Sequence, residues 1–402
     1  LENLSINQVI VRNLDNEVFK LLKLRQPYIP KVSVAITGTN GKTSSSWYLA
    51  QICKINKIPT KLTGTLGYFK NLKKNKDSQL TTPSNLDLCQ FAYSSKKNKF
   101  SFISEASSHG LHQGRFNNFN VDIAAITNLS HDHLDYHKNY KSYVKSKMKL
   151  FNKILNTKGI AAINSRLKNY NSLKKYLMKQ KTKIITFGSK DVYFYEDDNL
   201  YLYVFGKKYI LKKFELLNNI KKENLECAIA CALAMKIDIN KIIKCLSKLK
   251  SAPGRFEIIN YKKKKSKIVI DYAHTPDALE NILKSFSKNK FKPSVVFGCG
   301  GNRDKEKRKK MAVIAKKFAN KVYITDDNPR DENPKIIRKV IKKYCPKGIE
   351  IPNRKKAIYE AIQKLDINDT LVIAGKGHEK FQFIKDKKIK FDDYKIVKNF
   401  IE

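Results

Sequence analysis

The sequence lacks the patterns that would assign it to several large classes of protein. Its 402 residues contain no run close to the roughly 20 consecutive apolar residues of a membrane-spanning helix. No charged segment followed by an apolar one leads the chain, so a signal peptide is not predicted. The seven cysteines form no Cys-x-x-Cys pair, which excludes a zinc ribbon and gives no disulfide framework. We therefore expect a reducing, cytoplasmic location.

Acidic residues are also scarce, with 36 Asp+Glu against 81 Lys+Arg and a formal net charge of +45. Such a charge can indicate nucleic-acid binding. The excess is mostly Lys, however, and it is spread along the chain together with abundant Asn, Ile and Tyr, the residues that A/T-rich codons specify. We therefore predict no nucleic-acid partner and interpret the basic runs 262–265 and 305–310 as solvated surface. A hydrophobic content of 42% excludes global disorder.

Apolar strand patterns alternate with helical ones along most of the chain. Helices are predicted at 18–23, 44–55 and 221–235, a hairpin at 191–206, and strands at 32–36, 100–104, 122–127, 159–163, 183–187, 268–272, 294–297, 322–325 and 370–374. A break at Ser251-Ala252-Pro253-Gly254 separates two alternating segments. The pattern predicts an α/β fold with parallel sheets: a central domain over 32–252 and a C-terminal Rossmann-like α/β domain over 253–402.

A glycine-rich loop lies between the first predicted strand and the following helix. It consists of Gly38, Thr39, Asn40, Gly41, Lys42 and Thr43. Glycines allow backbone N–H groups to close on phosphate oxygens at a helix N-terminus, Lys42 would neutralise phosphate charge, and the Thr43 hydroxyl would reach Mg²⁺. The strict eight-residue phosphate-loop pattern fails because Ile36 replaces its first glycine. Strand, loop and helix together still predict a site for a nucleoside triphosphate, so residues 32–252 are expected to form a central P-loop-type parallel-sheet ATPase domain.

Two further segments follow predicted strands and carry candidate metal ligands. Glu105 ends one strand, where it is either a cap or a ligand beside the phosphate loop. The run 128–137 is rich in His and carboxylates and includes His133. Mg²⁺ prefers oxygen ligands, whereas a site made of histidines alone would favour zinc. The residues by themselves leave these alternatives open.

Eight motifs occur in order over residues 32–402: GTNGKT, SEASSHGLHQGRF, NLSHDHLDYH with SYVKSKMKLF, PGRFE, DYAHTPDAL, FGCGGNRDKEKR, DDNPR and AGKGHE. Together they resemble the Mur ligases, and within that family the UDP-N-acetylmuramoyl-tripeptide synthetases. The resemblance implies an ATP- and Mg²⁺-dependent enzyme of peptidoglycan synthesis. Its expected partners are UDP-N-acetylmuramoyl-L-alanyl-D-glutamate, which is activated as an acyl phosphate, and meso-diaminopimelate, whose amine attacks that intermediate.

The resemblance also implies roles for individual residues. Asn224, Arg255 and Asp271 match contacts to ATP in addition to the phosphate loop, and Arg255 would reach the γ-phosphate from the second domain. Thr43 and Glu105 would bind one Mg²⁺, and His133 would join a second metal site. Lys147 matches a lysine that the family carbamylates, which would turn a cation into an oxygen ligand. Lys42, His133, Lys147 and Arg255 are therefore the expected catalytic residues.

The same resemblance implies two substrate pockets. The positions that match muropeptide contacts are Thr81, Thr82, Ser108, Gln113 and Arg115. The positions that match diaminopimelate contacts are Arg303, Asp327, Asn328, Arg330, Gly375 and Glu379. Arg330 is predicted to hold the distal carboxylate of meso-diaminopimelate through a two-pronged hydrogen bond. An L-lysine-adding enzyme has no distal carboxylate to bind, so Arg330 favours diaminopimelate over lysine.

Some features depart from the family pattern, and other functions remain as alternatives. Asn218, Lys221 and Asn353 differ from the residues usual there. Residues 1–31 are long enough only for the end of a UDP-binding domain and a linker, so we expect a fragment of a longer monomeric protein that binds ATP but binds the nucleotide-sugar substrate poorly. The alternatives are a lysine-adding ligase, a folylpolyglutamate synthase-like ligase and, more remotely, a basic P-loop ATPase acting on nucleic acid.

Overall fold

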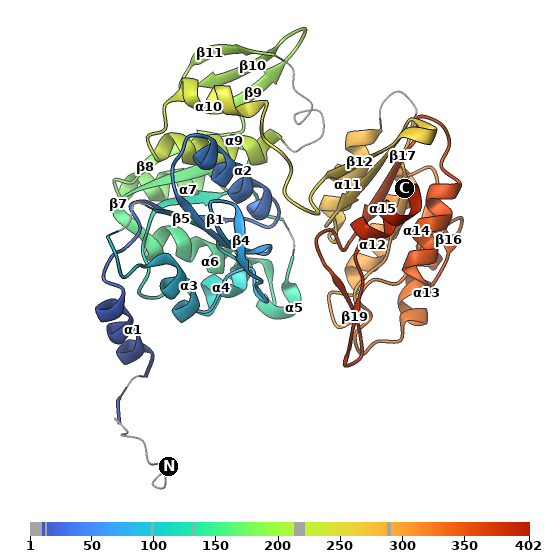
Figure 1. Cartoon of the computed structure of the whole chain (residues 1–402), viewed down its shortest axis with the longest axis horizontal. Coiled ribbons are helices and arrows are strands. Elements are labelled where there is room, and N and C mark those ends of the chain that lie inside the picture. The colour runs from blue at the N-terminus through green and yellow to red at the C-terminus, as the bar shows by residue number, and fades with distance from the viewer. Residues whose placement is uncertain (1–9, 13, 98–99, 131, 213–221, 288–290) are drawn as a thin grey trace.

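The computed structural model describes residues 10–12, 14–97, 100–130, 132–212, 222–287 and 291–402. Within these residues the chain forms two α/β bodies side by side, joined by a segment near residue 250 (Figure 1). The N-terminal body is built on an eleven-stranded sheet and the C-terminal body on a six-stranded sheet. A two-stranded hairpin extends from the second body. The predicted α/β class is confirmed.

The strands of the larger sheet lie in an order different from their order in the chain. In spatial order they are β11 (Lys207–Leu211), β10 (Leu200–Val204), β9 (Val192–Glu196), β8 (Lys183–Phe187), β7 (Leu155–Asn164), β6 (Val121–Ile126), β1 (Ser33–Thr37), β5 (Ser101–Glu105), β2 (Thr60–Gly64), β3 (Gly67–Lys70) and β4 (Lys73–Lys76). Neighbouring strands from β9 to β2 pair in parallel, and the pairs β9–β10, β10–β11, β2–β3 and β3–β4 are antiparallel. The carboxyl ends of β1, β5 and β6 therefore meet at one edge, where a ligand site is expected.

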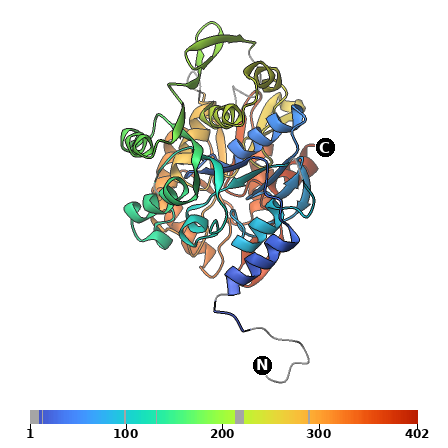
Figure 2. The same cartoon turned by 90° about the vertical axis from the view of Figure 1, so that its left-hand side faces the viewer.

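Helices cover both faces of this sheet (Figure 2). They are α1 (Leu14–Arg25), α2 (Lys42–Ile55), α3 (Asn85–Ala92), α4 (Ser108–His112), α5 (Leu134–His137), α6 (Tyr140–Lys149), the π-helical turn Leu150–Ile154, α7 (Tyr170–Lys179), α9 (Lys222–Ala234) and α10 (Ile239–Leu246). One apolar core joins the sheet to α2, α9 and α10, and a second joins it to α3, α4 and α7. Because the central parallel strands are covered on both faces, β1 and β6 are mostly apolar along their length.

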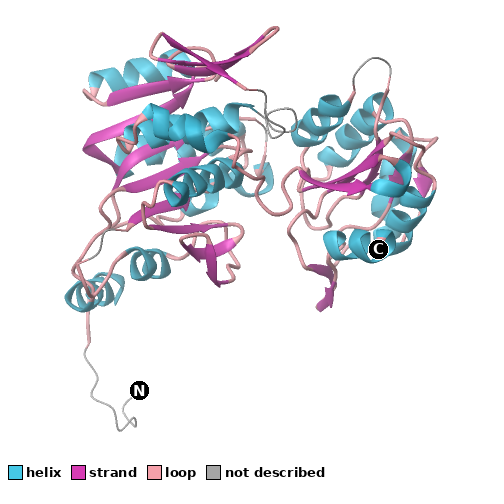
Figure 3. Cartoon of the chain, turned by 45° about the horizontal axis from the view of Figure 1, so that its top comes forward, coloured by secondary structure: helices cyan, strands magenta, loops and turns pink. Residues whose placement is uncertain are grey.

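The C-terminal body repeats the layered plan on a smaller scale (Figure 3). Its sheet has the order β12 (Glu257–Tyr261), β13 (Ser266–Asp271), β17 (Thr370–Ala374), β14 (Ser294–Phe297), β15 (Val322–Ile324) and β16 (Ile349–Glu350), and the extending hairpin consists of β18 (Phe381–Ile384) and β19 (Lys387–Lys390). The helices are α11 (Pro276–Phe286), α12 (Glu306–Phe318), α13 (Pro334–Tyr344), α14 (Arg354–Gln363) and α15 (Asp393–Ile401), with a 3₁₀ turn at Lys262–Lys264. Cores lie on both sides of the sheet.

Most predicted elements are present, and the differences are local. The strands at 183–187, 294–297 and 370–374 have the predicted bounds, and the hairpin at 191–206 is present with β11 added as a third strand. The predicted helix at 221–235 is seen as α9, whereas the departures at Asn218 and Lys221 lie outside the described residues. Strands β2, β3 and β4 were not predicted. Among the described residues, no helix is long and apolar enough to cross a membrane.

Candidate active site

The glycine-rich loop connects β1 to α2 and leaves the start of that helix open. Gly41 is the N-cap of α2, with φ 85°, and no side chain caps the helix. A Cβ at Gly38 (φ 146°) would lie 1.9 Å from Thr127 Oγ1, and one at Gly41 would lie 2.2 Å from Asn224 Oδ1. Both positions therefore require glycine. The uncapped N–H groups form the kind of helix N-terminus that binds phosphate.

Lys42 folds back over this loop. Its Nζ donates to the backbone carbonyls of Gly38 (2.8 Å) and Thr39 (3.0 Å). Burial lowers the pKa of Lys42, while the nearby carboxylates of Glu105 and Asp132 oppose this shift. The side chain thus places a cation among backbone oxygens at the loop, in reach of the phosphates that such a loop binds.

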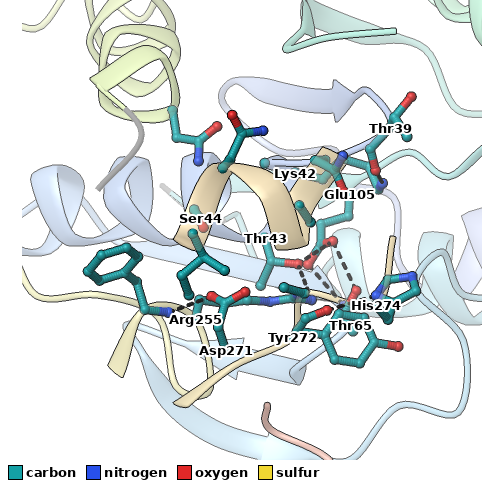
Figure 4. Close-up of a pocket in the computed structure, with 18 of the residues that line it drawn as sticks. Thr39, Lys42, Thr43, Ser44, Thr65, Glu105, Arg255, Asp271, Tyr272 and His274 are labelled. Carbon is teal, nitrogen blue, oxygen red and sulfur yellow. Dashed lines mark hydrogen bonds between the residues drawn. The ribbon is translucent and has the colours of Figure 1, made fainter. Parts of the chain in front are cut away.

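Glu105 and Thr43 lie together below the loop (Figure 4). Thr43 Oγ1 donates to Glu105 Oε2 at 2.9 Å. Thr65, which follows β2, donates to the same carboxylate through its N–H (2.9 Å, to Oε1) and its Oγ1 (3.0 Å, to Oε2). Glu105 is 1% exposed, so its charge is held by these three donors. The arrangement gathers hard oxygen atoms at the helix start.

Lys147, on α6, lies beneath the same loop. It is 1% exposed, its Nζ donates to Gly38 O at 2.8 Å, and the ammonium lies 4.8 Å from the ring centroid of Tyr143. Burial, and then repulsion from Lys42, place the pKa of Lys147 well below its ordinary value. Tyr143 is itself tied to the loop by a 2.7 Å hydrogen bond with Thr39. A buried amine is thus hydrogen-bonded directly to the phosphate loop.

His133 stands next to Asp132 with a left-handed backbone conformation (φ 53°). Its Nε2 is 3.3 Å from Asp132 Oδ2, and its ring meets that of His109 edge-on at 4.7 Å. Burial lowers the pKa of His133 to about 4, although Asp132 opposes the shift. Within the described part of the chain, no group of three or more His, Cys, Asp or Glu side chains is arranged to hold a metal ion.

A cavity of about 410 Å³ lies between the two bodies and contains residues of both. From the C-terminal body, Arg255 extends to the phosphate loop, and its Nη2 is 3.4 Å from Thr43 Oγ1. The Arg255 guanidinium lies 4.1 Å from the ring centroid of Tyr272. Asp271 accepts from Phe256 N at 2.7 Å, and burial raises the pKa of its carboxyl. Asn224 Oδ1 is buried here without a hydrogen-bond partner among the described residues, as expected for a group that receives a ligand.

A second cavity, of about 200 Å³, adjoins the first. It contains all six residues that were predicted to contact diaminopimelate: Arg303, Asp327, Asn328, Arg330, Gly375 and Glu379. A Cβ at Gly375 (φ 113°) would lie 2.7 Å from Asp327 Oδ2. Burial, and then repulsion from Arg303, lower the pKa of Arg330. Among these six residues are two guanidinium groups, of Arg303 and Arg330, and two carboxylates, of Asp327 and Glu379, which fits a zwitterionic ligand.

The two cavities share a wall made of Asp132, His133, Tyr272 and His274. His274 bonds the carbonyl of Tyr272 through Nδ1 at 2.8 Å, and burial lowers its pKa to about 4. Ligands in the two cavities would therefore both contact this wall, which carries two imidazoles and a carboxylate.

Three of the residues predicted to contact the muropeptide are connected by a series of hydrogen bonds that begins at Glu105. Thr82 Oγ1 donates to Glu105 O at 2.8 Å, Arg115 Nη1 donates to Thr82 O at 2.7 Å, and Arg115 also bonds Gln113. Thr81 lines the larger cavity. The Oγ of Ser108 is buried without a hydrogen-bond partner within the described residues.

Comparisons with known proteins agree with this geometry. The family model of the Mur ligase middle domain matches residues 36–234, and that of the Mur ligase glutamate ligase domain matches residues 254–377. The chain belongs to the Mur ligase family. A relative from Rickettsia bellii (strain RML369-C), named UDP-N-acetylmuramoyl-L-alanyl-D-glutamate–2,6-diaminopimelate ligase, is 37% identical over 98% of this chain and 86% of its own length.

Solved structures of Mur ligases and their relatives share the fold. A UDP-N-acetylmuramoyl-L-alanyl-D-glutamate–2,6-diaminopimelate ligase is 32% identical, with a TM-score of 0.63, over 95% of this chain and 80% of that one. A bifunctional folylpolyglutamate synthase/dihydrofolate synthase from Yersinia pestis, complexed with AMPPNP and a Mn ion, has a TM-score of 0.70 over 93% of each chain. At 17% identity, the latter shows the fold alone.

Some residues of this Mur ligase site were missed from the sequence or misassigned. The run 305–310 was interpreted as solvated surface, which is wrong for two of its members. Arg308 is 2% exposed and donates to Glu332 at 2.9 Å, and Lys307 lines the second cavity and donates to His274 O at 3.3 Å. Thr65 was missed because β2 was missed. Residues 305–310 come just after the loop at the carboxyl end of β14, and ligand sites lie at such strand ends, so this position could have indicated their part in the site.

Proposed function

We propose that this Mur ligase joins meso-diaminopimelate to UDP-N-acetylmuramoyl-L-alanyl-D-glutamate at the expense of ATP, as a step of peptidoglycan synthesis. The observation that carries this proposal is the pair of adjoining cavities. The first contains a phosphate loop and the second contains arginine and carboxylate side chains, and Asp132, His133, Tyr272 and His274 line both. The names of the relatives at 37% identity point to the same reaction.

The reaction needs charge neutralisation and positioning more than covalent participation of the protein. The terminal phosphoryl group of ATP passes to the carboxylate of the muropeptide. The resulting acyl phosphate is attacked by the amine of the amino acid, and phosphate leaves as the amide forms. Lys42 and the N-terminus of α2 would bind the phosphates from one side, and Arg255 would add a positive charge from the other body. Asn224 and Asp271 would contact the nucleoside.

The residues near Thr43 fit Mg²⁺. Thr43 and Glu105 bring a hydroxyl and a carboxylate within 2.9 Å of each other, and Mg²⁺ binds oxygen while keeping several waters or phosphate oxygens. The ion would neutralise charge on the phosphates. His133 would coordinate a second metal ion. Lys147 fits carbamylation because a buried amine with a lowered pKa is unprotonated enough to add CO₂. The carbamate would supply the second ion with oxygen ligands.

The second cavity supports meso-diaminopimelate over L-lysine. Arg330 and Arg303 provide guanidinium groups for the distal carboxylate, and Glu379 and Asp327 provide acceptors for the distal ammonium. L-Lysine has the ammonium but not the distal carboxylate, so the positive charges of both arginines would have no ligand carboxylate to pair with. Thr81, Thr82, Ser108, Gln113 and Arg115 would hold the muropeptide between the two cavities.

We extend the proposal to organisation and location. Residues 32–252 would form the ATP-binding domain and residues 253–402 the amino-acid-binding domain of a monomer. All seven cysteines are free and buried, which supports a reducing compartment such as the cytoplasm.

A phosphate-release assay on the full-length protein tests the proposal. Phosphate should appear only when ATP, Mg²⁺, UDP-muropeptide and meso-diaminopimelate are all present, and the tripeptide product should be found by mass spectrometry. Higher kcat/KM with L-lysine, or phosphate release that needs DNA or RNA instead of muropeptide, would refute it.

A further inference from the structure

Lys376 is a fully buried charge next to the amino-acid pocket. It follows Gly375 at the end of β17, its side chain is 0% exposed, and it does not itself line the second cavity. An ammonium group has three N–H donors, and burial is tolerated only when these find partners. The contacts that Lys376 makes therefore show what the chain holds in place with it.

All three donors of Lys376 have acceptors. Its Nζ donates to Asn328 Oδ1 (3.0 Å), to Glu379 Oε2 (3.0 Å) and to the backbone carbonyl of Phe381 (2.7 Å). Asn328 and Glu379 line the amino-acid cavity, and Phe381 begins strand β18. One side chain thus connects two pocket residues to the hairpin behind them.

The position of Lys376 determines which way the Asn328 amide faces. Asn328 Oδ1 accepts from both Lys376 Nζ and Phe383 N (3.0 Å), so the oxygen must point to these two donors. The Nδ2 group is thereby directed to Glu379 Oε2, at 2.9 Å. A flipped amide would oppose its N–H₂ to the ammonium and to the amide N–H, which is repulsive.

Glu379 is fixed by the same contacts. Its Oε2 accepts from Lys376 and from Asn328, whereas Oε1 has a single, longer contact to Tyr272 OH at 3.4 Å. Oε2 is therefore saturated by the protein, and Oε1 is the oxygen left for a ligand. Glu379 is 27% exposed, at the cavity surface.

Strand β18 extends this support to the rest of the pocket loop. Gln382 Nε2 donates to Asp327 O at 2.6 Å, Arg330 N donates to Phe383 O at 3.1 Å, and Lys385 N donates to Arg330 O at 2.8 Å. Lys376 holds the first residue of this strand through Phe381 O. The hairpin therefore acts as a backing for the loop 327–330.

We propose that Lys376 is a positioning residue for amino-acid recognition: it orients the Asn328 amide and the Glu379 carboxylate so that Glu379 Oε1 receives the distal ammonium of the incoming amino acid. This inference rests on the proposed function for the identity of the amino acid, but not for the role of the lysine.

The test compares Lys376→Met with Lys61→Met in the full-length protein. Lys61 is the matched control, because it is another buried lysine (7% exposed) whose Nζ donates only to backbone, at Tyr93 O (3.0 Å) and Ala92 O (3.5 Å). Lys376→Met should raise the KM for the amino acid by about 10- to 100-fold, as expected for the loss of hydrogen bonds between charged groups, and leave the KM for ATP unchanged. Lys61→Met should change neither KM.

Two further variants separate positioning from a structural role. In a Glu379→Gln background, Lys376→Met should add little to the KM of the single variant, because both changes act through the same carboxylate. Lys376→Arg keeps the charge and should restore part of the lost affinity. If Lys376→Met does not fold, as judged by thermal unfolding and ATP binding, the Arg variant carries the test, with an intermediate KM expected. A wild-type KM in either variant, full additivity with Glu379→Gln, or an equal rise in the KM for ATP would overturn the inference.

The outcome can be distinguished from failure of the proposed function. A preference of the wild-type enzyme for L-lysine would refute the proposed function. The Lys376 variants would then be measured with L-lysine, because Glu379 would accept hydrogen bonds from its side-chain ammonium. Calorimetric titration of the amino acid in the presence of a non-hydrolysable ATP analogue gives the same comparison without turnover.

Discussion

Replacement of Arg330 by lysine tests the specificity of the amino-acid pocket most directly. Arg330 Nη1 already donates to Gly301 O (2.9 Å) and Asn328 O (3.4 Å). A lysine would have a single nitrogen to serve both carbonyls and the distal carboxylate of the ligand. Because Arg and Lys have the same Cβ, the left-handed backbone at this position (φ 49°) adds no new strain. The change therefore removes fork geometry and keeps charge.

The expected size of the effect follows from the bonds that are lost. A hydrogen bond to a charged group contributes about 1.5–3 kcal/mol, so the kcat/KM for meso-diaminopimelate should fall by about 10- to 150-fold. The kcat/KM for L-lysine should change little, because it has no distal carboxylate. The ratio of the two specificity constants should consequently fall by the same factor.

The assay is amino-acid-dependent phosphate release with each amino acid at several concentrations. Arg25→Lys is the control, because Arg25 ends α1 on an exposed surface away from the pocket. Unchanged use of meso-diaminopimelate by Arg330→Lys, or an equal loss with both amino acids, would show that Arg330 does not read the distal carboxylate.

Three other changes have definite expected outcomes. Gly41→Ala should abolish ATP binding measured by calorimetry, since its Cβ would lie 2.2 Å from a neighbouring side-chain oxygen. Gly206 is the control, because it has φ 80° and open space around it. Gly206→Ala should lower the free energy of unfolding in urea by only about 1–2 kcal/mol and should bind ATP normally. Arg354→Met should lower the free energy of unfolding by about 3–5 kcal/mol, because it leaves Asp393, also 0% exposed, without its 2.7 Å ion pair; equal stability of the single variant and wild type would contradict this. Burial raises the pKa of the Glu226 carboxyl from 4.5 to about 7. Between these pH values the folded protein binds a proton at Glu226 that the unfolded chain has released. The stability that this proton provides is fully present below pH 4.5 and is lost as the pH rises through 7. Glu226→Gln should therefore be more stable than wild type at pH 8 by about 3 kcal/mol, and a wild-type pH profile of chemical denaturation in this variant would exclude the assignment.

The part of the fold that could be predicted from sequence is the part whose strands are apolar on both faces. The strands at 183–187, 294–297 and 370–374 are of this kind. Strand β2 was missed because Lys61 interrupts its apolar pattern. The structure shows why a lysine is tolerated there: its amine meets the carbonyls at the end of α3, which a helix leaves without partners. That partner lies in a segment about 30 residues away, and local sequence does not show it.

The candidate site divides in the same way. The phosphate loop could be named from sequence because it stands between a predicted strand and a predicted helix, and the loop 327–330 because it resembles a motif of the family. Thr65 and Lys376 could not, since their importance depends on hydrogen bonds to Glu105 and Asn328, residues on other strands or loops. The register of a parallel sheet decides which of these segments meet.

Burial, rather than abundance, distinguishes the informative lysines of this basic chain. Among the described residues, Lys61, Lys147 and Lys376 are the lysines that are buried, despite a total of 81 Lys+Arg. Removing an ammonium group from water is costly unless all its donors are satisfied, so compositional drift toward lysine can fill solvated positions but not these three. Lys61 donates hydrogen bonds only to backbone near a helix end. Lys147 instead bonds the phosphate loop at Gly38, and Lys376 bonds Asn328, which lines the amino-acid cavity. The +45 charge therefore says little about function, and the two lysines hidden from solvent at the cavities say more than all the exposed ones.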